Sequence, residues 1–308
     1  MPTRYYSHPL CLEHITPPGH PERPDRLRAV EEALTAEPFM LLERFSAPEA
    51  DTSTFTLAHP QSHVDRFVKL VPASGIARVD ADTSASPKSL LAVQRAVGAA
   101  LDAVDAVFAG EADNAFCAIR PPGHHAERTV PMGFCFINTI AVAARHAQRK
   151  HGAERVAIID FDVHHGNGTQ DIFKSDASVL YASTHQMPLY PGTGAASERG
   201  VGNIFNAPLS EGDNGEAFRE AFTSRILPAI DAFSPDLILL SAGFDAHWRD
   251  PLAGLELTAA DFDWITGQAM ELAGRHCANR VVSLLEGGYD LQGLAESTAA
   301  HVHRLMAG

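Results

Sequence analysis

Two aspartates and two histidines stand at the end of the apolar run in VAIIDFDVHHGNGTQ (156–170). Ionised carboxylates are rarely left unpaired where a strand enters a core, so this strand end needs a partner for them. Residues two apart on an extended segment point the same way, which puts Asp160, Asp162 and His164 on one side. With Asp245 from another strand end, Asp162 and His164 would make a metal site of oxygen and nitrogen ligands. Three protein ligands and one open position are typical of catalytic zinc.

Proton carriers stand in two other segments. PPGHHAE places His124 and His125 after a rigid turn, and beside a metal-bound water they are suited to move protons, because imidazole titrates near working pH. Asp160 is free to orient one of these rings. Tyr289, in EGGYD, can donate a hydrogen bond to a developing oxyanion. Taken alone, two adjacent histidines are more often ordinary surface residues, and a tyrosine after Gly-Gly is otherwise a turn residue.

Four polar segments, RPPGHHAE, DFDVHHGNG, SAGFDAH and EGGYD, each follow a predicted strand. In an open parallel sheet, ligands bind in the crevice outside the carboxyl ends of the strands. We therefore expect these segments to converge on one edge, although they are spread between positions 124 and 289. This convergence favours a metal site over the simpler interpretation, in which Asp162 and His164 form a hydrogen-bonded pair that braces a loop.

Short apolar runs with β-branched residues alternate with segments of helical periodicity. Runs that are apolar on both faces indicate a parallel sheet covered on two sides. The pattern predicts a single α/β domain over residues 1–308, with a mostly parallel central sheet and helices on both faces. The predicted strands are 115–119, 155–160, 178–184, 236–242 and 280–286. The predicted helices are 21–37, 86–110, 137–152, 215–233, 258–276 and 293–306.

The chain has 308 residues and a formal net charge of −14. An acidic protein repels nucleic acid and anionic membranes, so we expect neither as a partner, whereas cationic substrates would be attracted. The four cysteines have no C-x-x-C spacing and predict no disulfide framework. No signal-peptide pattern or transmembrane run is visible, so we expect a cytoplasmic protein.

Most of the other histidines are interpreted as ordinary loop or helix-face residues without an identifiable partner. His20 and His185 differ, because both lie in loops that can reach the predicted site. The histidines given the ordinary interpretation are His8, His14, His59, His63, His146, His151, His276, His301 and His303.

The polar segments together resemble the zinc-dependent histone deacetylase family, most closely its class II branch and bacterial relatives. The resemblance rests on RPPGHHAE, GFCFINTIAVAA, DFDVHHGNGTQ, SAGFDAH, DPLAG and LLEGGYD, and it runs from about residue 20 to about 300. It implies an arginase-like α/β domain with a mostly parallel sheet, in agreement with the pattern above. It also implies one catalytic Zn²⁺ and one or two structural K⁺ ions.

The resemblance assigns a role to each candidate residue. The implied zinc ligands are Asp162, His164 and Asp245, and the implied catalytic residues are His124, His125, Tyr289 and Asp160, with Asp160 buttressing His124. The implied monovalent-cation site comprises Asp160, Asp162, His164, Ser183 and Thr184, and a second one involves Phe173, Asp176 and Val179. The implied walls of a narrow acyl-lysine tunnel are Gly133, Phe134, His185, Tyr190 and Leu252.

The implied reaction is amide hydrolysis by metal-activated water, with His125 as general base and Tyr289 at the oxyanion. Two departures from the family pattern stand out. Asn167 replaces the aspartate that partners the second histidine in some members, although class II members share the asparagine. Trp248 and Arg249 are bulky where several relatives carry small residues, which predicts a differently shaped tunnel rim.

Two substrate classes remain open: an acyl-lysine protein or peptide, and a small acylated amine. A lysine deacylase is favoured because Leu252 stands where polyamine-specific relatives are expected to carry a glutamate. An acetylpolyamine amidohydrolase remains the alternative, since Glu127 or Glu198 can approach the mouth. A dinuclear manganese ureohydrolase would need more bridging carboxylates, and a catalytically dead binding module would lack a ligand, a histidine or Tyr289. A homo-oligomer is compatible with the sequence.

Overall fold

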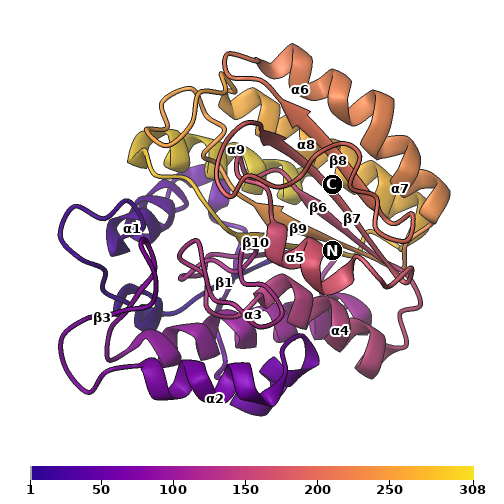
Figure 1. Cartoon of the computed structure of the whole chain (residues 1–308). Helices are drawn as coiled ribbons and strands as arrows, with labels where there is room; N and C mark the ends of the chain where they lie inside the picture. Colours follow the sequence, from indigo (N-terminus) through magenta and orange to yellow (C-terminus); the bar gives the residue numbers. More distant parts are fainter. Residues whose placement is uncertain (1) are drawn as a thin grey trace.

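The computed structural model describes residues 2–308, so Met1, the first residue of the predicted domain, lies outside the described residues. An eight-stranded sheet forms its centre, in the order β2-β1-β5-β10-β9-β6-β7-β8 (Figure 1). Every pair of neighbours in it is parallel, which confirms the predicted mostly parallel sheet. Its strands are β1 (Thr3–Ser7), β2 (Glu43–Ser46), β5 (Asn114–Cys117), β6 (Val156–Asp160), β7 (Val179–Gln186), β8 (Ile204–Leu209), β9 (Leu237–Ala242) and β10 (Val281–Leu285).

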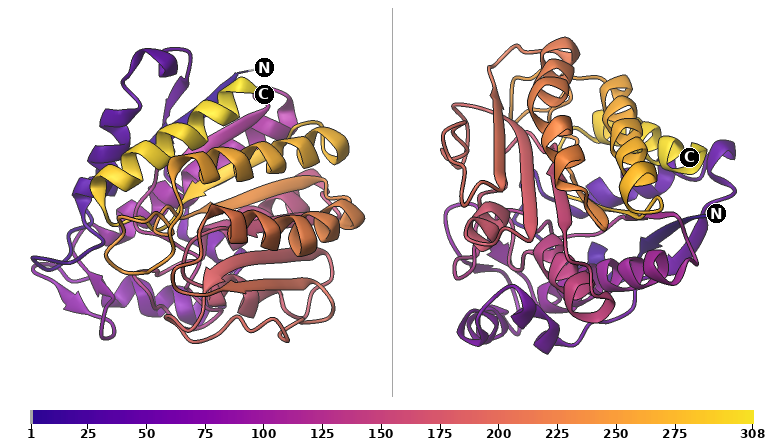
Figure 2. Two further views of the ribbon diagram at one scale, coloured as in Figure 1. Left: turned by 90° about the horizontal axis from the view of Figure 1, so that it is seen from above. Right: turned by 90° about the vertical axis from the view of Figure 1, so that its right-hand side faces the viewer.

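Helices cover both faces of this sheet, as its apolar pattern predicts. Ile159 of β6 faces one hydrophobic core and the preceding Ile158 faces another, because successive side chains of a strand point to opposite faces. α8 and α9 pack on the first face, and α3 and α4 pack on the second (Figures 1 and 2). The helices are α1 (Pro24–Ala33), α2 (Gln61–Leu70), α3 (Ser89–Ala109), α4 (Thr139–His151), α5 (Asn167–Phe173), α6 (Gly215–Ala221), α7 (Leu227–Phe233), α8 (Ala259–His276) and α9 (Leu291–Ala307).

The structure agrees with the five predicted strands and with most of the predicted helices, and adds elements that the sequence pattern did not indicate. The predicted helix 215–233 consists of α6, one π-helical stretch (Phe222–Ile226) and α7. β1, β2, β8, α2 and α5 were not predicted. β2 is exposed along its whole length, so it carries no apolar signal. A two-stranded hairpin of β3 (Ala77–Arg78) and β4 (Ser84–Ala85) was also not predicted.

The sheet order decides where the polar segments lie. β5, β10, β9 and β6 are consecutive neighbours, and each of the four polar segments leaves the carboxyl end of one of them.

The first and last elements also meet, since the Thr3 hydroxyl donates to the carbonyl oxygen of Leu305 at 3.2 Å, and Figure 2 shows the two termini side by side. Within residues 2–308, we find no helix with the length and apolar character needed to cross a membrane.

Candidate active site

Asp162, His164 and Asp245 meet at the carboxyl edge of the sheet. The Nδ1 atom of His164 lies 3.1 Å from Oδ1 of Asp162 and 3.1 Å from Oδ2 of Asp245. Asp162 and His164 follow β6, and Asp245 follows β9, the strand beside it. All three residues are buried, and their ligand atoms lie within 4.8 Å of one another. The spacing of the two β6 residues and the strand order together therefore produce a potential metal-binding centre.

Two carboxylates, those of Asp162 and Asp245, lie against the imidazole ring of His164 and shift its pKa. Burial by itself lowers the pKa of His164, but its hydrogen bonds to Asp162 and Asp245 and their charges raise that pKa to about 10. Burial and the charge of Asp162 raise the pKa of Asp245. The pKa of Asp162 lies below its usual range despite burial, because His124 and His164 are close. The centre therefore has a marked preference for positive charge.

Two glycines permit this close arrangement. The backbone N–H of Gly287 donates to Oδ2 of Asp162 at 2.8 Å, and a Cβ atom on Gly287 would overlap the Asp245 carboxylate. A Cβ atom on Gly243 would likewise overlap the carboxylate of Asp162. Sequence reasoning did not assign these glycines a role, although both lie in the polar segments SAGFDAH and EGGYD.

The ring of His124 is held by the carboxylate of Asp160. Its Nδ1 atom lies 3.0 Å from Oδ2 of Asp160, which also accepts a hydrogen bond from the hydroxyl of Tyr181 at 3.0 Å. Burial lowers the pKa of His124, but the charges of Asp160, Asp162 and Glu286 outweigh burial and hold that pKa well above its usual value. These carboxylates therefore favour the protonated form of His124, whose ring faces the centre.

His125 has the opposite character, although it is the next residue. Its Nδ1–H donates to Oδ1 of Asn167 at 2.8 Å, and the Asn167 amide is fixed because its Nδ2 donates to Glu127 at 2.8 Å. Burial and the charges of His124 and His164 hold the pKa of His125 well below its usual value. His125 is therefore neutral, with its Nε2 lone pair available to accept a proton.

Tyr289 is positioned through its backbone and its ring. Its N–H donates to Oδ2 of Asp250 at 2.7 Å, and the guanidinium of Arg26 lies over its ring at 4.9 Å. Arg26 in turn donates to the carbonyl oxygens of Gly288 and Glu286. Burial raises the pKa of Tyr289 well above its usual value, so the phenol stays protonated. Sequence reasoning did not identify Arg26 or Asp250, and the Asp250 of DPLAG was the available signal.

Glu286 is a further buried group that the sequence analysis did not identify. Its carboxylate accepts the backbone N–H of Gly123 at 2.7 Å and that of His124 at 3.2 Å. Burial raises the pKa of Glu286 to about 7. The carboxylate thus ties the end of β10 to the turn that carries His124 and His125.

A cavity of about 340 Å³ opens beside these groups and brings His125, His164 and Tyr289 to its wall. Four of the five residues that the resemblance implied for a tunnel wall line this cavity: Gly133, Phe134, Tyr190 and Leu252. His20, Leu189 and Asp82 also line this cavity. Trp248 is 55% exposed and is not among the residues that line this cavity.

The structure places His185 outside this cavity, in contrast to the predicted tunnel wall. His185 is fully buried, with Nδ1 2.9 Å from the Ser183 hydroxyl and Nε2 2.9 Å from the carbonyl oxygen of Gly194. Its side chain is directed into the protein because it belongs to β7, a buried strand, rather than to the loop that sequence reasoning assumed.

The two predicted monovalent-cation sites differ in the structure. The β6–β7 register pairs Asp160, the last residue of β6, with Ser183 inside β7, and Thr184 is the next residue of β7, so these residues of the first site are neighbours. At the second site, the carbonyl oxygens of Phe173, Asp176 and Val179 each accept from Nδ2 of Asn203, at 2.8, 3.0 and 2.8 Å. A side-chain amide therefore stands where the resemblance implied a second ion.

Comparisons with known proteins identify relatives of the whole chain. Residues 20–305 match the histone deacetylase domain. The chain is 38% identical over 318 residues to a probable deacetylase of Archaeoglobus fulgidus, covering 100% of this chain and 87% of the relative. It is 38% identical over 310 residues to the histone deacetylase-like amidohydrolase of Pseudomonas aeruginosa, covering 93% and 81%. The crystal structure of the HDA15 HD domain superposes with a TM-score of 0.94 at 36% identity, covering 99% of this chain and 88% of that one.

The family match spans nearly the whole chain, and the similar structure has the same fold. The potential metal-binding centre, the paired histidines and the tyrosine lie in the segments on which the sequence resemblance rests. The chain therefore belongs to the histone deacetylase family of amide-bond hydrolases.

Proposed function

We propose that this protein is a zinc-dependent amidohydrolase that removes acetyl or longer acyl groups from lysine side chains of proteins or peptides. The observation that carries the proposal is the cavity whose wall contains His125, His164 and Tyr289. Its lining by Phe134 and Leu252 suits the aliphatic stem of an acylated lysine, which is uncharged once acylated. Together these groups bring a base, a metal ligand and an oxyanion donor to one binding site.

The donor set of Asp162, His164 and Asp245 fits a catalytic zinc ion. It offers two carboxylate oxygens and one imidazole nitrogen, all buried and close together, and no thiolate, which is typical of an open site rather than a closed structural one. When bound, such an ion supplies Lewis-acid polarisation of the amide carbonyl and lowers the pKa of water.

The side chains around this centre divide the proton transfers between them. Neutral His125, with Nδ1 committed to Asn167, takes a proton from the attacking water at Nε2 and delivers it to the departing amine. The protonated phenol of Tyr289 donates to the oxygen that gains negative charge. His124, held as an imidazolium by Asp160, stabilises that negative charge and does not need to release its proton.

We further propose that one catalytic domain spans residues 1–308 and that one K⁺ ion is held beside the centre by Asp160, Asp162, His164, Ser183 and Thr184. The direct β6–β7 pairing of Asp160 with Ser183 supports this ion site. The amide of Asn203 argues against a second K⁺ ion at Phe173, Asp176 and Val179.

Hydrolysis of small acetylated polyamines is the second candidate function. The two glutamates considered for binding a distant ammonium are engaged elsewhere: Glu127 accepts from Asn167, and Glu198 accepts from Gly194 and Ala195. Asp82, however, lines the cavity and is exposed, so a carboxylate is present at its mouth. The apolar side chain of Leu252 favours an acyl-lysine substrate. The carboxylate of Asp82 could bind the ammonium of a polyamine, so an acetylated polyamine stays the competing substrate.

The deciding experiment assays the zinc-loaded protein with an acetyl-lysine peptide and with N-acetylputrescine, side by side. We expect a higher kcat/KM for the peptide. A higher kcat/KM for N-acetylputrescine that falls in Asp82→Asn would overturn the lysine assignment. Tyr289→Phe should lower kcat for either substrate by about 10²–10³-fold, and an unchanged kcat would contradict the proposed mechanism.

A further inference from the structure

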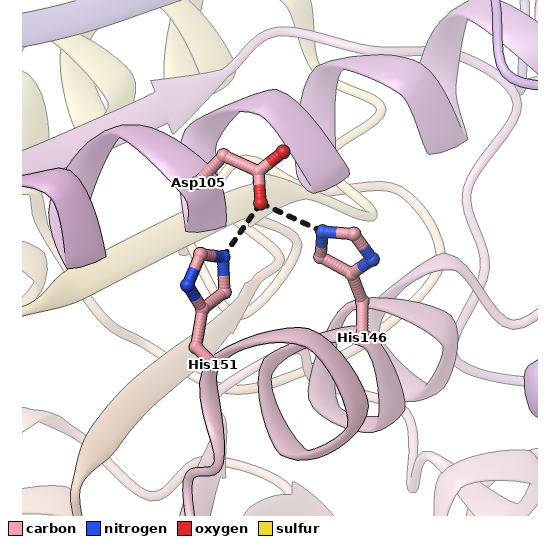
Figure 3. A group of neighbouring side chains, drawn as sticks. All are labelled: Asp105, His146 and His151. Atoms are coloured by element: carbon pink, nitrogen blue, oxygen red, sulfur yellow. Dashed lines mark hydrogen bonds and ion pairs between the residues drawn. The ribbon is translucent and has the colours of Figure 1, made fainter.

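A second group of potential metal ligands lies between α3 and α4, away from the catalytic centre. Nε2 of His146 and Nε2 of His151 lie 2.8 Å and 2.6 Å from the same oxygen, Oδ1 of Asp105 (Figure 3). α3 leads into the amino end of β5 and α4 into that of β6. The group therefore lies toward the opposite edge of the sheet from the catalytic side chains, and sequence reasoning gave both histidines an ordinary role.

The three side chains are held in place by their neighbours. The ring of His151 is stacked on Phe108, with centroids 4.6 Å apart and planes 7° from parallel, and Arg280 lies 4.8 Å from the centroid of Phe108. Lys150 donates to Oδ2 of Asp105 at 2.7 Å. The other carboxylate oxygen, Oδ1, is directed at the rings of His146 and His151 (Figure 3). A second polar partner that orients a ligating carboxylate is a common feature of metal sites.

The charge and access of the group also suit a metal ion. Burial would raise the pKa of Asp105, but its hydrogen bonds to Lys150, His151 and His146 outweigh burial and lower that pKa, so the carboxylate is ionised. The side chains of His146, His151 and Asp105 are 15%, 19% and 31% exposed. An ion can therefore enter from solvent and keep a water molecule as a further ligand.

The distances require only a small adjustment. Zinc bonds of about 2.0–2.1 Å in tetrahedral geometry separate two ligand atoms by about 3.3 Å. The hydrogen-bonded separations of 2.8 and 2.6 Å must therefore widen by roughly half an ångström, which rotation of part-exposed side chains permits. Two imidazoles and one carboxylate suit Zn²⁺ and similar divalent transition metals rather than Ca²⁺ or Mg²⁺.

We propose that Asp105, His146 and His151 form a second metal site, which binds one divalent transition-metal ion and links α3 to α4. This inference does not rest on the proposed function, because neither the ligands nor the helices that carry them form part of the catalytic centre. The alternative is that the two rings only donate hydrogen bonds to Asp105.

The test measures zinc bound per chain in the full-length, tag-free protein after dialysis against Zn²⁺. His146→Gln/His151→Gln is the informative variant, because glutamine can still donate to Asp105 and keep the two helices together. We expect this double variant to bind one zinc ion fewer than wild type, to show a smaller rise in Tm on zinc addition and to keep its amide hydrolysis. His276→Ala is the matched control, since it breaks a comparable contact of 2.7 Å to Asp231 that involves a single histidine.

Equal zinc content in wild type and the double variant would overturn the proposal, and so would an equal loss in His276→Ala. The zinc count is independent of catalysis: an inactive protein that still loses one zinc ion in the double variant would contradict the proposed function alone.

Discussion

Nδ1 of His125 lies 2.8 Å from a neutral amide oxygen of Asn167, whereas Nδ1 of the adjacent His124 lies 3.0 Å from a carboxylate oxygen of Asp160. The two rings thus have different partners, and only His124 gains a charge that stabilises its protonated form. We expect Asn167→Asp to raise the pKa of His125 and to move the acidic limb of the kcat/KM profile to higher pH.

The same relationship predicts the effect of removing the partner. Asn167→Ala should lower kcat/KM by about 10–100-fold, since the ring loses the hydrogen bond that fixes its tautomer. Asp171→Asn, a nearby change at a residue that accepts from the backbone of Arg128, is the control. An unchanged pH profile in Asn167→Asp would contradict the assignment of His125 as the base.

Removal of the Tyr289 hydroxyl tests the oxyanion donor. We expect Tyr289→Phe to lower kcat by about 10²–10³-fold with little change in KM, because the hydrogen bond strengthens in the transition state. Tyr190→Phe is the control, since Tyr190 lines the same cavity, is 38% exposed and packs edge-on against His125 through its ring. Comparable losses in both variants would argue for a packing effect.

Glu286 provides a prediction for stability. Glu286→Ala leaves the N–H groups of Gly123 and His124 without their buried acceptor, at a cost of about 1–3 kcal/mol for each. Glu286→Gln keeps an acceptor oxygen and should lose much less. Urea unfolding monitored by circular dichroism distinguishes the two variants, and equal midpoints for Glu286→Ala and wild type would contradict the role of this carboxylate.

Buried neutral histidines predict a loss of stability in acid. Burial lowers the pKa of His301 from 6.5 to about 3, and burial lowers the pKa values of His59 and His185 to about 4. Below about pH 6.5 the unfolded chain binds protons that the folded chain does not. The free energy of unfolding should therefore fall as pH decreases from about 6.5 toward 4, by up to about 1.4 kcal/mol per pH unit for each histidine.

His301→Gln should reduce this slope, because it removes one of the groups that titrate in the unfolded state only. His303→Gln, at an exposed position on the same helix, should keep the wild-type slope. The measurement is the unfolding free energy at several pH values, and an unchanged slope in His301→Gln would contradict the prediction.

The sequence predicted those parts of the molecule that depend on strong local patterns. Two-residue spacing placed Asp162 and His164 on one side, and the parallel-sheet rule placed Asp245 beside them without any knowledge of strand order. β2 could not be predicted in this way, since Glu43–Ser46 is exposed on both sides and gains its conformation only by pairing with β1.

Partners that are distant in sequence also remained hidden. Asp105 reaches His146 and His151 from 41 and 46 positions away, so no local spacing indicates the contact. His185 was misplaced because the strand β7 extends to Gln186, beyond the predicted end at 184, and carries the ring into the interior.

Asn203 holds the carbonyl oxygens of Phe173, Asp176 and Val179 with a donor that is covalently part of the chain. A bound ion can dissociate, so its occupancy depends on its concentration in the buffer. The Asn203 amide belongs to the chain, so its local concentration near these carbonyl oxygens is fixed. The segment between α5 and β7 should therefore hold its shape through dialysis and through exchange of potassium for sodium. We expect the order of this segment to depend on the polypeptide rather than on the salt in the buffer.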